Sequence, residues 1–210
     1  MRPADNLSYE ENIESDVEED NNLAHLLLTN KLFYISFPIF AYVFAVLLQT
    51  KLNDIVDIQY GASILYLSFG VRLFVAFMFG ISGLLWMVLG QIFIFTLHPT
   101  PYYINNPVES FLLTCIYSVI AYLAVEFVRK IRNLDGDFSN VRSLDIGLIT
   151  VLASLLAAIT HFAILGSHFP DPLYGLLNSF ASKLVGSMIG FYGLMVLFAG
   201  LHNIKTSPKV

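Results

Sequence analysis

The sequence predicts an all-α protein, a polytopic transmembrane helical bundle, and three observations support that prediction. Hydrophobic residues make up 56% of the 210 residues and charged residues only 13%, with a mean hydropathy of +0.68. Several apolar runs reach the length of about 20 residues that crosses a bilayer core as a helix. The short alternating segments of a membrane barrel do not occur. Because backbone polar groups must be paired inside a membrane, such runs predict packed helices.

Composition divides the chain into three parts. The first twenty residues hold eight of the 16 acidic residues and a single base, Arg2, with too little apolar surface to fold alone. We therefore expect residues 1–22 to be a disordered acidic tail, which either solubilises the protein or docks a basic partner. It lacks the basic start and apolar core of a signal peptide. Residues 23–203 are predicted to form the transmembrane domain and 204–210 a short C-terminal tail.

Six membrane spans are predicted, and one of them is uncertain. Segment 61–79 has the length of a span, but Arg72 lies about 15 Å along it, near the middle of the membrane. No other Asp, Glu, Lys or Arg occurs for 14 positions before Arg72 or 36 after it. Its cost of about 2.5–3.5 kcal/mol is one that apolar neighbours can offset. Residues 172–183 are expected to form a short interfacial helix. The five other spans are 32–49, 81–97, 109–128, 145–166 and 184–202.

The orientation follows from the basic residues of the 129–144 loop, which mark that loop as cytoplasmic. With six spans, both termini are then cytoplasmic. In a rival five-span arrangement, 73–97 is one helix, Arg72 sits at its cytoplasmic mouth and the acidic tail lies outside. The charge balance barely separates the two. We favour six spans because Gly80 and Gly83 suit a tight turn between two helices.

Ionisable residues in or near the membrane are candidate functional groups. The ligand-binding candidates are Arg72, His161 and Glu126. Arg72 has no carboxylate within its own helix, so it requires carbonyls, hydroxyls, water or a carboxylate from another span; it either lines a cavity for an anionic group or anchors the structure. His161 is either a packing histidine or a proton relay, and Glu126 can pair locally with Arg129. Lys183 is expected to extend to the outer headgroups.

Small residues predict close helix packing. The series Ser182, Gly186 and Gly190 places a smooth stripe on the last span, and Ala153 and Ala157 do the same beside His161 on the span before it. These two helices are expected to pack on each other or on a partner. The candidate helix-packing residues are Gly70, Gly80, Gly83, Gly90, Ser182, Gly186 and Gly190.

The stretch Leu65-Tyr-Leu-Ser-Phe-Gly-Val-Arg-Leu-Phe-Val-Ala-Phe-Met-Phe-Gly80, followed by Gly83 and Gly90, resembles the first membrane-associated sensor family of bacterial signalling proteins. The basic pair Arg129-Lys130 and the glycine-rich 185–190 segment are similar as well. The resemblance covers about residues 60–200. It departs from the family at Ser68, where a proline is usual, and at Ser187, where an aspartate often stands. It implies a free-standing sensor-like domain that signals through a separate partner.

No phosphate loop, nucleophile elbow, zinc-ligand spacing or dinucleotide fingerprint occurs, so we expect no enzyme, no cofactor and no metal site. Cys115 is the only cysteine. The leading hypothesis is a non-catalytic, multi-pass protein of the bacterial inner (plasma) membrane that acts as a sensor or interaction module. Its expected partners are the lipid bilayer and a membrane or cytoplasmic protein, and not nucleic acid. The alternatives are a small-solute transporter, or its substrate-binding subunit, and an accessory subunit of a larger membrane complex.

Overall fold

The computed structural model describes residues 30–56, 66–97, 107–134, 141–165 and 171–203, and in these ranges it contains five helices and no strand. All five are long and apolar enough to cross a membrane. The predicted all-α membrane-spanning class is thereby confirmed, whereas the tails at 1–22 and 204–210 lie outside the described residues. The helices are α2 (Lys31–Val56), α3 (Leu67–Leu97), α5 (Pro107–Arg132), α6 (Ser143–Leu165) and α7 (Pro172–Asn203).

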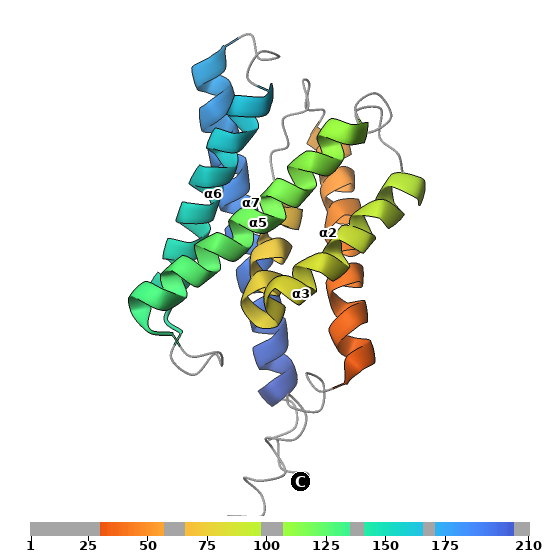
Figure 1. The fold of residues 1–210 in the computed structure, drawn as a ribbon, viewed down its shortest axis with the longest axis vertical. Helices are drawn as coiled ribbons and strands as arrows, with labels where there is room; N and C mark the ends of the chain where they lie inside the picture. Colours follow the sequence, from red (N-terminus) through yellow and green to blue (C-terminus); the bar gives the residue numbers. More distant parts are fainter. Residues whose placement is uncertain (1–29, 57–65, 98–106, 135–140, 166–170, 204–210) are drawn as a thin grey trace, which may run out of the picture.

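Helix α3 folds back on itself at Gly80. Gly80 has φ 60° and ψ −150°, a backbone conformation that essentially only glycine adopts. A Cβ atom on Gly83 would lie 2.8 Å from Val75 Cγ1, although residues eight apart in a straight helix are about 12 Å apart. Residues 67–79 are called here the first limb and residues 81–97 the second limb. Figure 1 shows the second limb turning away from the first at the yellow bend.

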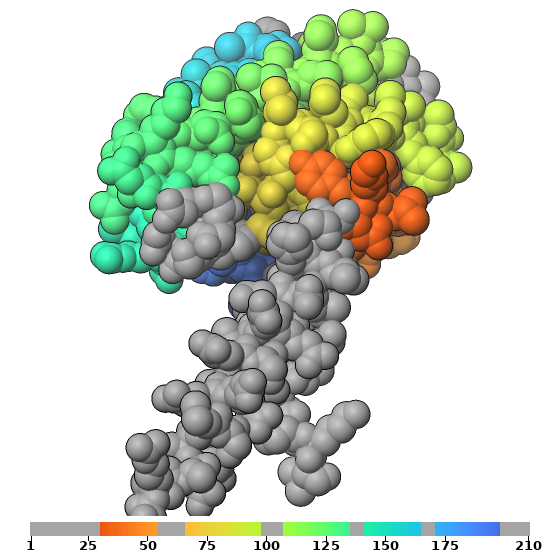
Figure 2. All heavy atoms as spheres, turned by 60° about the horizontal axis from the view of Figure 1, so that its bottom comes forward, coloured from red at the N-terminus to blue at the C-terminus, as the bar shows by residue number. Residues whose placement is uncertain are grey.

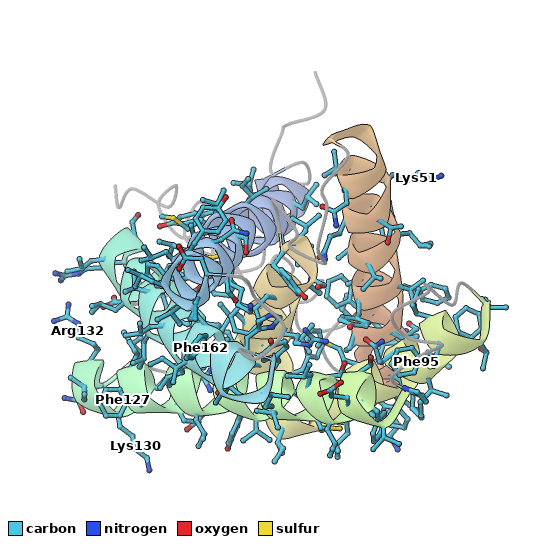
Figure 3. All side chains as sticks on the ribbon, turned by 90° about the horizontal axis from the view of Figure 1, so that it is seen from above. Lys51, Phe95, Phe127, Lys130, Arg132 and Phe162 are labelled. Carbon is cyan, nitrogen blue, oxygen red and sulfur yellow. The ribbon has the colours of Figure 1, made fainter. Side chains whose placement is uncertain are left out.

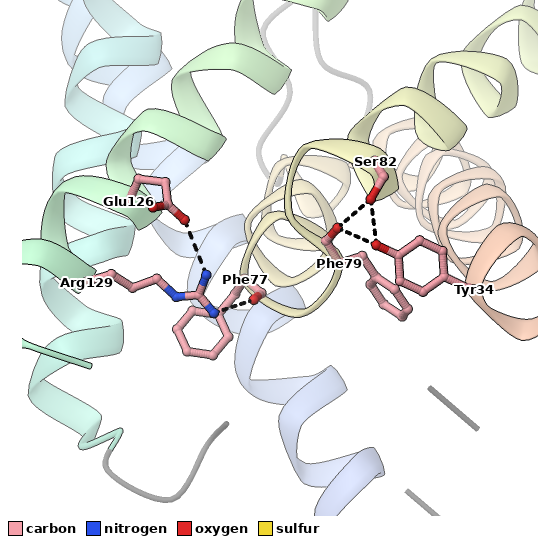
Figure 4. A network of polar contacts seen from close by, with 6 residues as sticks. All are labelled: Tyr34, Phe77, Phe79, Ser82, Glu126 and Arg129. Atoms are coloured by element: carbon pink, nitrogen blue, oxygen red, sulfur yellow. Dashed lines mark hydrogen bonds and ion pairs between the residues drawn. The ribbon is translucent and has the colours of Figure 1, made fainter. Parts of the chain in front are cut away.

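Donors from two neighbouring helices satisfy the carbonyl groups that this turn leaves open. Arg129 of α5 donates from Nη2 to the Phe77 carbonyl at 3.0 Å, and Tyr34 of α2 donates to the Phe79 carbonyl at 2.9 Å. Ser82 Oγ donates to the same Phe79 carbonyl at 3.0 Å (Figure 4). The last carbonyls of a helix have no intrahelical partner, and a cation there also suits the helix dipole.

The first limb is the centre of the bundle. Phe69, Leu73, Phe74 and Val75 are fully buried. The rings of Phe74 and Phe77 meet Phe191 of α7 edge to face. Helices α2, α5 and α7 pack around this limb, and α6 packs mainly on α7 and α5. Figure 2 shows α3, in yellow, reaching the surface between α2 in orange and α5 in green.

The side chains on the outward faces of the helices are mostly large and apolar, as a lipid-facing surface requires. Lys51 and Lys130, near the C-terminal ends of α2 and α5, extend away from the bundle (Figure 3). Charge is therefore kept towards the helix ends of this surface. Exposed side chains include Phe40, Phe44, Leu85, Phe93, Leu123, Phe127, Leu155, Ile159, Ile189 and Val196.

Helix α7 runs without a break from Pro172 to Asn203, so the predicted separate interfacial helix at 172–183 is wrong. Asp171 caps the start of α7 by accepting from the backbone N–H groups of Leu173 and Tyr174. The apolar span that begins at residue 184 is thus the continuation of a helix that starts about 18 Å earlier. Pro38 lies inside α2, and α2 continues through it.

The conformation at Gly80 makes one substitution diagnostic. We expect Gly80→Ala to lower the free energy of unfolding by about 1–3 kcal/mol, because a Cβ atom strains this backbone whatever space surrounds it. Gly147→Ala is the matched control, since it adds a methyl group at another position with nothing within 4 Å. Thermal unfolding in detergent measures both. Equal midpoints for the two variants would contradict the expectation.

Candidate ligand-binding site

Arg72 lies in the first limb of α3 and is only 3% exposed. Its Nη2 donates to the Tyr42 hydroxyl of α2 at 2.6 Å, and its Cζ lies 4.8 Å from the centroid of the Tyr42 ring. The ring of Tyr117 on α5 is 5.9 Å away. Of the partners considered for Arg72 from the sequence, the structure therefore provides a hydroxyl group and aromatic faces from other helices.

Tyr42 also joins Arg72 to Gln91, which lies on the second limb. The Tyr42 hydroxyl accepts the bond from Arg72, so its own proton goes to Gln91 Oε1. Because Tyr42 bonds the Oε1 atom of Gln91, the Nε2 atom of Gln91 is not bonded to Tyr42. The buried nitrogens Arg72 Nε and Gln91 Nε2 have no hydrogen-bond partner. Both are donors, so this part of the site is short of acceptors.

Lys183 is the second buried cation, and the prediction that it reaches the outer headgroups is wrong. It is 0% exposed and donates from Nζ to Ser179 Oγ at 2.5 Å. Nζ lies 4.7 Å from the centroid of the Tyr66 ring and 5.3 Å from that of Tyr117. The reason is the unbroken α7, which places Lys183 about 16 Å from the helix start and turns it towards α3 and α5.

Tyr117 connects the two cations with His161. Its ring is flanked by Arg72 and Lys183, and its hydroxyl is 2.7 Å from His161 Nδ1 on α6. Arg72, Lys183, Tyr42, Gln91 and Tyr117 are called here the buried cation cluster, with His161 at its edge. Two of the predicted candidates, Arg72 and His161, are thus brought together through Tyr117.

Glu126, the third candidate, is elsewhere. Its Oε1 pairs with Arg129 Nη1 at 3.2 Å, and its side chain is 32% exposed, near the end of α5. A second ion pair at this end joins Arg132 to Asp145 of α6 at 2.8 Å. Asp145 also accepts from the Arg142 backbone N–H, which caps α6. Glu126 thus pairs within α5 and Asp145 joins α5 to α6, and neither forms an ion pair with Arg72 or Lys183 in the described part of the chain.

The described partners of the two buried cations carry no negative charge. Among the described residues, no carboxylate pairs with Arg72 or Lys183, and their polar partners are neutral hydroxyl groups. An ion removed from water costs several kcal/mol unless a partner compensates it. Each desolvated contact of a cation with an aromatic face offsets about 2 kcal/mol of this cost. The arrangement is thus suited to receive negative charge.

Glycine residues hold α7 against the first limb beside Lys183. A Cβ atom on Gly70 would lie 2.8 Å from the carbonyl oxygens of Gly186 and Ser187, and one on Gly186 would overlap the backbone of Tyr66. The Tyr66 N–H donates to the Ser182 carbonyl at 3.1 Å. The small stripe of α7 therefore faces α3, although Ser154 and Ser187 also bring α6 and α7 together at 3.4 Å.

The two other glycine candidates pack within the α2 and α3 region. Gly83 lies against Phe79 and Val75 of the first limb, and a Cβ on Gly90 would lie 3.3 Å from the Ile39 carbonyl of α2. These glycines allow the second limb to approach both neighbours. The second limb can then present Gln91 to Tyr42.

Sequence reasoning missed Tyr42, Gln91 and Tyr117 as site residues and misplaced Lys183. Two signals were present. Gln91 interrupts an apolar run, and Ser179, Lys183 and Ser187 recur every four residues, which places polar groups on one face of a helix. Which tyrosine meets which cation depends on contacts between helices.

No group of three His, Cys, Asp or Glu side chains that could hold a metal ion occurs in the described part of the chain. No protein-family model, no curated protein and no solved structure matches this sequence. The resemblance to the membrane-associated sensor family stays a prediction.

We expect Gly70→Ala to destabilise the protein by about 1–3 kcal/mol, because the methyl group would meet fixed backbone atoms of α7. Gly193→Ala, also within a long helix but with nothing within 4 Å, is the control. Thermal unfolding midpoints in detergent compare the two. A Gly70→Ala protein as stable as the control would mean that the two helices do not approach this closely.

Proposed function

We propose that this protein is a non-catalytic integral membrane protein that binds a small anion inside its helical bundle and carries it across the membrane. The observation that carries the proposal is the buried cation cluster: two enclosed cations flank one tyrosine ring, and their described partners are neutral. The site also lies beside a helix that is interrupted in mid-course, and interrupted helices recur where membrane carriers bind their substrates.

A sensor-like module that works through a separate protein partner is the second candidate. The observation that favours it is the enclosure of the cations: Lys183 is fully buried, and the adjoining contact of Gly70 with Gly186 leaves no space for a methyl group. An anion that enters such a site has to move α3 relative to α7, and that movement is a signal that a partner could receive. Binding without transport would then be the outcome.

We further propose six spans with both termini in the cytoplasm of a bacterial inner membrane. The fold-back at Gly80 supports six passes, because the two limbs run side by side. The turn contacts Arg129, near the basic end of α5, and Tyr34, near the start of α2. The turn, the start of α2 and the basic end of α5 therefore share one side of the bundle, the side that the positive-inside rule makes cytoplasmic.

Anion binding is tested on the purified protein with sulfate, phosphate, chloride and succinate, first as ligands and then as substrates for uptake into proteoliposomes. We expect at least one to bind, and Arg72→Leu to weaken its binding about 30-fold or more, the equivalent of ~2 kcal/mol for a buried charge. Lys130→Met is the control, because Lys130 is an exposed base outside the cluster. Uptake supports a carrier, and binding without uptake supports the sensor-like module. Binding that Arg72→Leu leaves unchanged would refute the site.

The topology has its own test, in a Cys115→Ser background with single cysteines at Lys31, Lys51 and Lys130. With six spans, a membrane-impermeant maleimide added to intact cells labels the Lys51→Cys protein and spares the other two. With five spans, the Lys31→Cys protein is labelled and the Lys51→Cys protein is spared. Permeabilised cells, in which all three are labelled, provide the control.

A further inference from the structure

We propose that the ligand of the buried cation cluster is a doubly charged oxyanion, with Arg72 and Gln91 holding one part of it and Lys183 another. This inference rests on the proposed anion binding and specifies its ligand. Three features of the cluster lead to it: the number of charges, the kind of hydrogen-bonding atoms left over, and the position of both cations around one ring.

The first feature is the charge count. Arg72 and Lys183 come from different helices, and both side chains are buried. A single negative charge would compensate one of the two cations, and the other would remain buried without a counter-charge. Two negative charges on one ligand compensate both and also remove the repulsion between them.

The second feature is the hydrogen-bond inventory. The buried atoms of the cluster without partners, Arg72 Nε and Gln91 Nε2, are both N–H donors. Lys183 can donate three hydrogen bonds, and its one hydrogen-bond partner in the described bundle is Ser179. The ligand must therefore supply acceptors, which are the oxygens of a sulfate, phosphate or carboxylate group. Chloride offers one charge and no set of separate acceptors.

The third feature is geometric. Arg72 Cζ and Lys183 Nζ lie 5.9 and 5.3 Å from the centroid of the Tyr117 ring. Tyr42 then holds the Arg72 guanidinium on the side where Gln91 lies. A ligand that displaces part of the Tyr117 packing would therefore lie within reach of both cations. The same chemistry is offered by an inorganic dianion, a small dicarboxylate and a lipid phosphate monoester.

The experiment compares pairs of a dianion with a related monoanion, by calorimetry on the full-length protein at a pH where the phosphate monoester is doubly ionised. In detergent the pairs are sulfate against perchlorate and succinate against succinamate. In phosphatidylcholine nanodiscs the pair is phosphatidate against phosphatidylglycerol. We expect the dianion of at least one pair to bind about tenfold or more tightly than its monoanion. The pair in which the dianion binds more tightly identifies the ligand as an inorganic anion, a dicarboxylate or a lipid.

Charge variants then test the two cations. Lys183→Gln is expected to abolish the preference for the dianion, and Lys183→Arg, which restores the charge, to retain it. Lys130→Gln is the matched control and keeps the wild-type preference. The comparison of pairs on the wild-type protein stands even where a variant fails to fold.

Three results would overturn the inference. If perchlorate, succinamate or phosphatidylglycerol bind as tightly as their dianionic counterparts and Arg72→Leu abolishes their binding, the protein binds anions but the site takes one charge. If Lys183→Gln keeps the full preference for dianions, Lys183 does not hold the ligand. If none of the six compounds binds, this inference fails, and the proposed anion binding fails with it only when chloride and phosphate do not bind either.

Discussion

A helix that reverses direction leaves carbonyl groups without intrahelical partners, and the donors that satisfy them here come from two neighbouring helices. Arg129 of α5 and Tyr34 of α2 donate to the carbonyls of Phe77 and Phe79, so the turn at Gly80 is joined to the C-terminal end of α5 and to the start of α2. The same turn lays the limbs of α3 side by side. Arg72 and Gln91, far apart along the helix, then meet at Tyr42. The fold-back is thus the condition for the buried cation cluster.

The cluster itself is stabilised only in part. Tyr42, Tyr66 and Tyr117 present ring faces to the cations, and Ser179 and Tyr42 accept one hydrogen bond each. Such contacts offset a fraction of the cost of burying two ions. The carboxylates Glu126 and Asp145 are engaged with Arg129 and Arg132. In the described part of the bundle these two acids therefore lie near helix ends, whereas the bases Arg72 and Lys183 are buried inside it.

Part of this arrangement was predictable. Hydropathy alone located α6 to within two residues at each end, but it placed the start of the last helix at 184 and not at 172. Gly80 was expected at a tight turn, where it adopts its glycine-specific conformation. Arg72 was identified because no other charged residue lies near it in sequence. Lys183 was misplaced because its position was measured from the start of the apolar run at 184, whereas α7 begins at Pro172. The depth of Lys183 within α7 depends on the residue at which α7 begins, and the hydrophobic composition of the segment does not determine that residue.

The sequence by itself determined the apolar all-α class, the turn at Gly80 and the pairing of Glu126 with Arg129. These follow from local properties: the length of apolar runs, the freedom of glycine and the spacing of charges along one helix. Only the tertiary structure decided that Arg72, Lys183 and His161 converge on Tyr117. That convergence depends on the rotation and close approach of four helices. Gly70 and Gly186 permit the approach of two of them, through contacts between residues distant in sequence.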